Sequence, residues 1–141
     1  MTQQEIQERN KQIALMMGAI DYKADKWYKL GGYKEHIYFP NWNYPNRFLE
    51  KDLKFHSDWN WLMEAVEFIE KQRYEVIFFN HYNWVEHGRC CIRDYKNSEL
   101  IYISSDYKKE AVFIAVSDFA KLFSYNNINK NYERNLSNPR G

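Results

Sequence analysis

Residues 58–79 read DWNWLMEAVEFIEKQRYEVIFF, and the periodicity of this stretch changes from helical to extended part-way along. In its first part, Trp59, Leu62 and Val66 recur at spacings of three and four residues, which predicts a helix over 58–72. Few positions of this segment are polar, so we expect the helix to contact other elements on two sides. The second part is rich in β-branched and aromatic residues, as is typical of a strand.

The strand pattern repeats towards the C-terminus. Turn residues at 87–88 and 96–98 separate the extended segments. We expect strands at 74–84, 89–95 and 99–103. Three short strands joined by short turns most simply form an antiparallel meander. A further helical pattern covers 107–125, and Asp106 is a candidate cap for that helix.

The pattern towards the N-terminus predicts a helix, a hairpin and an irregular segment. Apolar residues at helical spacing indicate a helix over 3–17, which Gly18 can end. Two strands are expected within 26–39, because the Gly31-Gly32 pair permits the backbone conformation of a tight turn. Residues 40–56 contain two prolines and several Asn residues, which favour irregular structure.

These elements predict an α+β fold in the order α-ββ-α-βββ-α, with a mainly antiparallel sheet covered by three helices. The chain has 141 residues, which is ordinary single-domain size. We expect residues 1–125 to form one domain and the Asn-rich residues 126–141 to form a flexible C-terminal tail. The predicted core residues are Trp59, Leu62, Val66, Ile77, Phe79, Val112 and Phe119.

Composition limits the classes of function. The formal net charge is +1, from 20 basic and 19 acidic side chains, so no overall field attracts nucleic acid or membrane. No apolar run approaches the ~20 residues of a membrane-spanning helix. The N-terminus lacks the basic and apolar segments of a signal peptide. The adjacent Cys90 and Cys91 form no disulfide framework, which fits a reducing compartment. We therefore expect a cytoplasmic protein.

Side chains that bind metal or act as nucleophiles are few. The candidates are His56, His81, His87, Cys90 and Cys91. Their spacing does not follow the paired pattern of zinc sites, and adjacent cysteines on a strand point to opposite faces. A Cys–His pair across a hairpin is conceivable, but two half-buried strand cysteines are the commoner arrangement. Glycine-rich phosphate loops are absent. We expect no metal, no cofactor and no enzymatic activity.

A nucleic-acid-binding module is the alternative hypothesis for function. The hairpin region 23–38 interleaves lysines with aromatic residues, which can neutralise phosphates and stack on bases. The residues that would do so are Lys26, Trp27, Tyr28, Lys29, Tyr33 and Lys34. An ordinary edge hairpin with its lysines in water explains the same pattern.

Protein binding is the favoured hypothesis. Several Trp and Tyr residues fall in loops or at the ends of elements, where they can anchor an interface. The loop 40–48 is the first candidate surface, because prolines reduce the entropy that a loop loses on binding. The predicted protein-binding residues are Trp42, Tyr44, Arg47 and Trp84. Tyr95, Tyr107 and Tyr125 belong to the same group of aromatics.

Residues 53–66, LKFHSDWNWLMEAV, resemble a pattern in small phage and mobile-element proteins of Bacteroidota-type hosts. Those proteins also tend to end in a helix similar to 109–119, and many begin with a helix that closes on Met-Gly, as at Met17-Gly18. The resemblance implies no catalytic residues. It implies an accessory protein that binds a host protein, such as an anti-CRISPR inhibitor of an RNA-guided CRISPR effector, in the host cytoplasm.

Overall fold

The structure is a computed structural model that describes residues 1–21, 36–40, 47–80 and 88–137. Side chains are described within these ranges except at 79–80 and 125–137. In chain order, the elements are α1 (Gln3–Met16), β1 (Ile20–Asp21), β2 (His36–Tyr38), β3 (Arg47–Leu49), the 3-10 helix η2 (Glu50–Asp52), α2 (Trp59–Lys71), β4 (Glu75–Asn80), β5 (Gly88–Arg93), β6 (Glu99–Ser105) and α3 (Lys108–Ser137).

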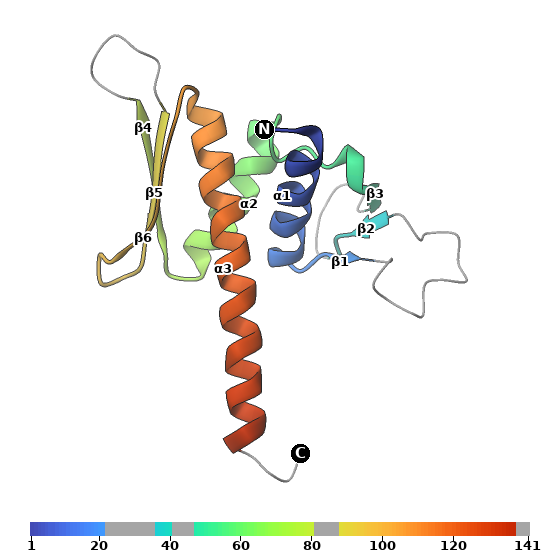
Figure 1. The fold of residues 1–141 in the computed structure, drawn as a ribbon, viewed down its shortest axis with the longest axis vertical. Helices are drawn as coiled ribbons and strands as arrows, with labels where there is room; N and C mark the ends of the chain where they lie inside the picture. Colours follow the sequence, from blue (N-terminus) through green and yellow to red (C-terminus); the bar gives the residue numbers. More distant parts are fainter. Residues whose placement is uncertain (22–35, 41–46, 81–87, 138–141) are drawn as a thin grey trace.

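Helices α1, α2 and α3 lie between two small antiparallel sheets (Figure 1). Strands β4, β5 and β6 form one sheet in that order, and β1, β2 and β3 form the other. Helix α3 packs mainly on β5 and β6, whereas α2 packs on β4. Helix α1 packs on the other side of α3, towards the second sheet. Within the described ranges, no helix covers the outer face of the β4-β5-β6 sheet (Figure 1).

Local signals at both ends fix the position of α1. The Thr2 hydroxyl accepts a hydrogen bond from the Glu5 backbone N–H, and the Glu5 carboxylate accepts one from the Thr2 N–H, which is a capping box. At the other end Gly18 has φ 90, a conformation that suits glycine. The Gly18 and Ala19 N–H groups donate to the Leu15 and Ala14 carbonyls, so the last turn is satisfied.

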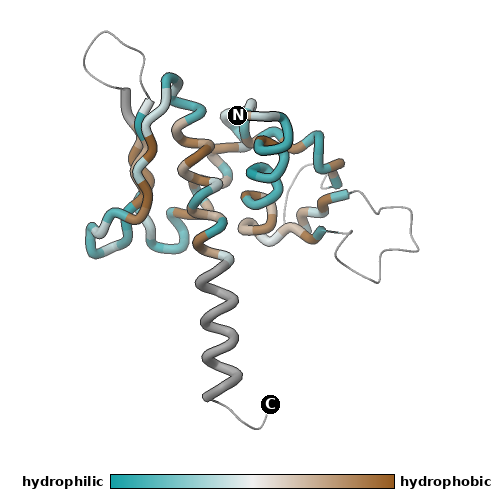
Figure 2. The backbone as a smooth tube through the Cα atoms, viewed as in Figure 1, coloured by the Kyte–Doolittle hydropathy of each residue, from teal (hydrophilic) through white to brown (hydrophobic). Residues whose placement is uncertain are grey.

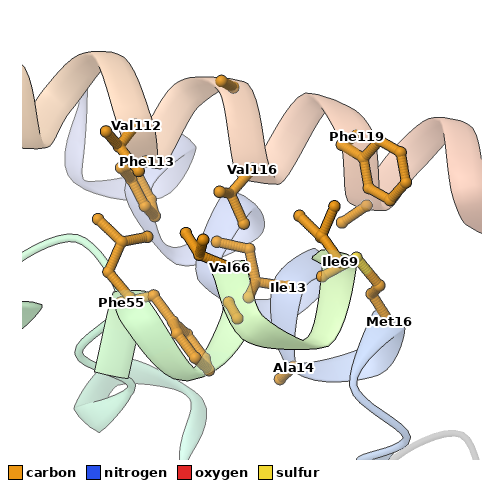
Figure 3. Close-up of a cluster of buried hydrophobic side chains, with 14 of the residues drawn as sticks. Ile13, Ala14, Met16, Phe55, Val66, Ile69, Val112, Phe113, Val116 and Phe119 are labelled. Carbon is orange, nitrogen blue, oxygen red and sulfur yellow. The ribbon is translucent and has the colours of Figure 1, made fainter. Parts of the chain in front are cut away.

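The main core lies where the helices meet each other and the inner face of the β4-β5-β6 sheet. Figure 3 shows apolar side chains from α1, α2 and α3, among them Ile13, Val66 and Val116, pointing towards one another. In the part of α3 that Figure 2 colours by hydropathy, α3 contributes apolar residues to this core, among them Val112, Val116 and Phe119. On its other side α2 presents Trp61 to Phe48 and Phe55, at ring-centroid distances of 4.9 and 5.2 Å. The prediction that α2 is contacted on two sides is confirmed.

The predicted α+β class is confirmed, but the arrangement differs in one respect. Instead of one sheet covered by helices, the described strands form two sheets of three strands each. The sequence did not reveal β1, which has only two residues, or β3, which lies within the segment expected to be irregular. Such short strands have too few residues for an alternating pattern, and their pairing with β2 creates them.

Several predicted details need correction. Helix α3 ends at Ser137 and not near residue 125, so most of the expected tail has helical backbone. Trp59 is exposed, because it occupies the first turn of α2 and reaches only the rim of the core, beside Phe78. Ile77 is half-buried on the open outer face of its sheet. The side chain of Phe79 lies outside the described residues. The other predicted core residues are buried: Leu62, Val66, Val112 and Phe119.

Candidate protein-binding surface

A hollow of about 290 Å³ opens where three separate segments meet at one end of the β4-β5-β6 sheet. The segments are the connection from α2 to β4, the turn from β5 to β6, and the middle of α3. We call this hollow the turn groove. Its lining residues are Gln72, Arg73, Tyr74, Asp94, Tyr95, Leu100, Phe119, Leu122 and Phe123.

The turn groove has an apolar floor and exposed apolar walls. Tyr95, Leu100 and Leu122 are 75%, 40% and 36% exposed, which is high for large apolar side chains gathered at one hollow. Beneath them Phe119 contacts Tyr74, with ring centroids 4.8 Å apart. Such a surface can receive an apolar side chain from another molecule.

Asp94 fixes the turn that carries Tyr95. Its Oδ1 accepts hydrogen bonds from the backbone N–H groups of Lys96 and Ser98, both at 2.9 Å. Its own backbone N–H donates to the Ser98 carbonyl, and the Asn97 N–H donates to the Asp94 carbonyl. Asn97 has φ 63, a conformation that Asn tolerates better than most residues. Because the turn is held at so many points, Tyr95 is presented on a defined backbone.

A register shift in the sheet positions Leu100. Ile92 pairs with Ile101, but the next residue, Arg93, pairs with Glu99, so Leu100 is the extra residue on β6. An extra residue interrupts the strict alternation of side chains between the two faces. Ile101 packs against the core on the face of the sheet that the helices cover. Leu100 lines the turn groove at the end of that face.

Arg73 lies at the rim of the turn groove in a left-handed conformation, with φ 69. It follows the end of α2, and its N–H donates to the Glu70 carbonyl at 3.0 Å. Glycine usually occupies this position after a helix, because a Cβ is strained there. Residues held in strained conformations often lie at functional sites. Arginine is also common at the centre of protein interfaces.

The predicted loop surface is only partly covered by the described residues. Arg47 is exposed at the start of β3, with its guanidinium carbon 5.7 Å from the centre of the Tyr38 ring. It therefore lies on the β1-β2-β3 sheet, on the other side of the helices from the turn groove (Figure 1). The other three predicted protein-binding residues lie outside the described residues: Trp42, Tyr44 and Trp84.

The nucleic-acid hypothesis also depends on residues outside the described ranges. These are Lys26, Trp27, Tyr28, Lys29, Tyr33 and Lys34. Of the residues that form the turn groove, sequence analysis singled out Tyr95 as an accessible aromatic. It did not single out Arg73 or Leu100, because a left-handed backbone and a register shift leave no clear mark in the sequence. Leu122 lies within the helix expected over 107–125, a pattern that does not mark it as exposed.

The candidate nucleophiles occupy structural positions in β5. Cys90 is buried on the inner face, and burial, with the neighbouring Cys91, raises the pKa of its thiol to about 12. Cys91 points to the outer face, where its Sγ lies 3.6 Å from the Glu99 carboxylate. Burial and this carboxylate raise the pKa of the Cys91 thiol as well. Both thiols therefore stay protonated at neutral pH.

His56 belongs to a buried polar contact between α1 and the start of α2. Its Nδ1 lies 2.9 Å from Nδ2 of Asn10, which also donates to the Leu53 carbonyl at 3.1 Å. Burial lowers the pKa of His56, and the nearby Lys109 lowers it further. Within the described ranges, His, Cys, Asp and Glu side chains form no group of three that could hold a metal ion.

Comparisons with known proteins assign the chain to no family: no family model, curated protein or solved structure matches it. In the described part of the chain, none of the helices has both the length and the apolar character needed to cross a membrane.

Proposed function

We propose that this protein is a non-catalytic binding protein of the phage accessory type, which docks on a host defence protein through the turn groove and inhibits it. The observation that carries the proposal is the gathering of Tyr95, Leu100 and Leu122, all exposed, around one hollow. Large exposed apolar groups concentrated at one place are typical of protein-binding sites.

The composition of the turn groove suits a protein partner. Tyrosine and arginine are enriched among the residues that dominate binding energy, and Tyr95 and Arg73 supply both. Oδ1 of Asp94 already accepts hydrogen bonds from two backbone N–H groups, while Arg73 and Lys96 are exposed beside this residue. The rim therefore favours a partner that presents an apolar side chain flanked by acidic groups.

The choice of a defence protein as the target rests on the resemblance of residues 53–66 to mobile-element proteins. An RNA-guided CRISPR effector is the target class we put first. A steric inhibitor needs a stable scaffold and a contact of roughly 800 Å² on each partner. The turn groove with its surrounding turns offers a centre for such a contact.

Affinity purification from lysate of a Bacteroidota host, followed by mass spectrometry, tests the proposal. We expect the wild-type protein to recover a defence nuclease. Tyr95→Ser with Leu122→Ser should lose that protein, because both apolar walls of the turn groove become polar. Trp59→Ala is the matched control, since it removes an exposed aromatic outside the groove.

Two outcomes would contradict parts of the proposal. If the groove variant recovers the nuclease normally while Trp42→Ala with Tyr44→Ala does not, the docking surface is the loop 40–48. If only nucleic acid is recovered, and its binding weakens steeply as salt rises, the protein is a nucleic-acid-binding module. Melting curves of every variant must show that the fold is retained.

A further inference from the structure

Among the described residues, strand β6 is a sheet edge whose protection is limited to the register shift at Leu100. In the described part of the chain it pairs with β5 alone. Natural edge strands are commonly protected by lysine, proline or inward-pointing charges. Residues 100–105 read LIYISS and contain none of these. The only charged residue of β6 is Glu99, at the end where the register shift occurs.

We propose that a second copy of this chain occupies this edge, with the two β6 strands antiparallel about a two-fold axis at Tyr102. Tyr102 is the central residue of Glu99–Ser105, so this register pairs Ile101 of each copy with Ile103 of the other, and the register shift at Leu100 lies at the ends of the paired segment. The sheet then continues through six strands, three from each copy. Glu99 lies opposite Ser105 of the second copy, so like charges do not face each other across the axis.

The position of α3 supports the same axis. At one end of β6, Ser105 pairs with Gly88, which contacts the backbone of Lys108 at the start of α3. At the other end, Leu100 lines the turn groove together with Leu122. Strand β6 is about 24 Å long, and 16 residues of helix cover about the same distance. The part of α3 that lies over Tyr102 is therefore near residues 114–115.

The spacing between the two copies of α3 is that of packed helices. Because α3 packs on β5 and β6 with α2 on its β4 side, its opposite side faces past the β6 edge. Strands in a sheet are about 4.8 Å apart. A helix centred over the boundary between β5 and β6 lies one strand spacing from the axis, so the two α3 helices lie about 10 Å apart. Helices that pack together have axes about 8–10 Å apart.

Two exposed side chains match this arrangement. Tyr107 and Leu122 are 64% and 36% exposed at either end of the α3 segment that covers the sheet. Tyr107 immediately precedes α3 and Leu122 lies about one β6 length further along, so the two residues are about equally distant from the proposed axis. In an antiparallel pair of α3 helices, Tyr107 of one copy therefore lies beside Leu122 of the other copy. Tyr107 then completes the wall of the other copy's turn groove.

The area of the contact fits a reversible dimer. The β6 edge and the α3 layer above it form a strip about 24 Å long and roughly 20 Å deep, on the order of 500 Å² in flat projection. Because side chains are not flat, the accessible area buried is larger than this projection. It approaches the roughly 600–800 Å² per copy of small specific interfaces. We therefore expect the dimer to form as the protein concentration rises.

Cysteine cross-linking tests both the dimer and its register. In Tyr102→Cys the two new thiols lie directly opposite each other, with Cα atoms roughly 4.5–5.5 Å apart, within disulfide reach. Mild oxidation should give a covalent dimer. Ser104→Cys is the matched control, since Ser104 pairs with Leu100 of the second copy and its own counterpart lies about 14 Å away. Both variants also carry Cys91→Ser, because Cys91 is the cross-strand partner of residue 102 within one copy and its thiol would compete for the new one.

Sedimentation over a concentration series supplies the second measurement. Wild type should shift from monomer to dimer as concentration rises, and Tyr102→Lys should remain monomeric because two ammonium groups would meet at the axis. Since Tyr102 is 45% exposed, this variant should keep its melting temperature. A wild-type protein that stays monomeric, or cross-linking at residue 104 in place of 102, would overturn the proposal. Target recovery by monomeric Tyr102→Lys would separate the dimer from the proposed function.

Discussion

A side chain on Gly88 would collide with the backbone of Lys108: a Cβ built there lies 2.1 Å from the Lys108 Cα. Strand β5 and the start of α3 thus approach each other more closely than any residue with a side chain at position 88 would permit. This contact fixes the direction in which α3 leaves β6 and crosses the sheet.

Gly88→Ala should therefore be strongly destabilising. Forcing extra volume into a packed site costs roughly 1–3 kcal/mol or more, and backbone atoms cannot move aside as a side chain does. Chemical denaturation would measure the loss. Gly18→Ala is the control, because a Cβ at that position meets nothing within 4 Å and only the φ of 90 opposes the change. Its cost should be about 1–2 kcal/mol. Equal losses at the two sites would mean that the close approach at Gly88 is not decisive.

Arg73→Gly should stabilise the fold and weaken partner binding. The left-handed conformation of Arg73 costs roughly 1–2 kcal/mol, part of which glycine recovers, less the entropy that glycine loses on folding. We expect a gain of about 0.5–1 kcal/mol in the free energy of unfolding, measured with urea. Arg93→Gly offers no such gain, because Arg93, at the end of β5, has no positive φ for glycine to relieve. A loss of stability in Arg73→Gly would show that the guanidinium makes contacts that outweigh the strain.

His56 should make stability depend on pH. Its pKa is lowered in the folded protein, so the unfolded chain binds more protons below its ordinary pKa of about 6.5. Stability is complete above that value and declines as the pH falls from there towards the folded pKa. The Asn10 contact gives the reason, since a proton on Nδ1 would face the Nδ2 donor of Asn10.

Melting temperatures of wild type and His56→Gln between pH 7.5 and 5.5 would check this expectation. The difference between the two curves isolates His56 from other titrating groups. We expect wild type to lose stability more steeply than the variant as the pH falls. Parallel curves would mean that His56 titrates alike in the folded and unfolded chain.

The two cysteines should react slowly with thiol reagents. A thiol whose pKa is about 12 is almost entirely protonated at pH 7, and thiolate is the reactive form. A colorimetric disulfide reagent should label neither Cys90 nor Cys91 quickly in the native protein, and should label both after unfolding in guanidinium. Cys90→Ala with Cys91→Ser should retain target binding. A rapidly labelled native thiol would restore the hypothesis of a catalytic cysteine.

Leu62→Ala should cost about 2–5 kcal/mol, as expected for a large side chain removed from a packed core. Leu62 is fully buried near the start of α2. Leu122→Ala is the comparison, because Leu122 is partly exposed on α3 and should cost much less. Denaturation midpoints of the two variants would show whether the apolar stripe of α2 carries the core.

The sequence alone determined the elements with strong local signals. The apolar stripe through Leu62 and Val66 identified α2, and the β-forming run after Tyr74 identified β4. Glycine at position 18 ended α1 as predicted, because its freedom of φ is a property of the residue itself. These features depend only on residues close together in the sequence. The order of the strands in the β4-β5-β6 meander follows from the same local signals.

Only the tertiary structure decided the features that depend on residues far apart in the chain. Strands β1 and β3 exist because they pair with β2, and the turn groove exists because Arg73, Tyr95 and Leu122 come from three separate segments. Trp59 shared the helical spacing of the core yet lies at its rim, because periodicity gives the direction of a side chain and not where the neighbouring sheet ends. The register shift at Leu100 and the contact of Gly88 with Lys108 are set by packing between elements, which no local pattern encodes.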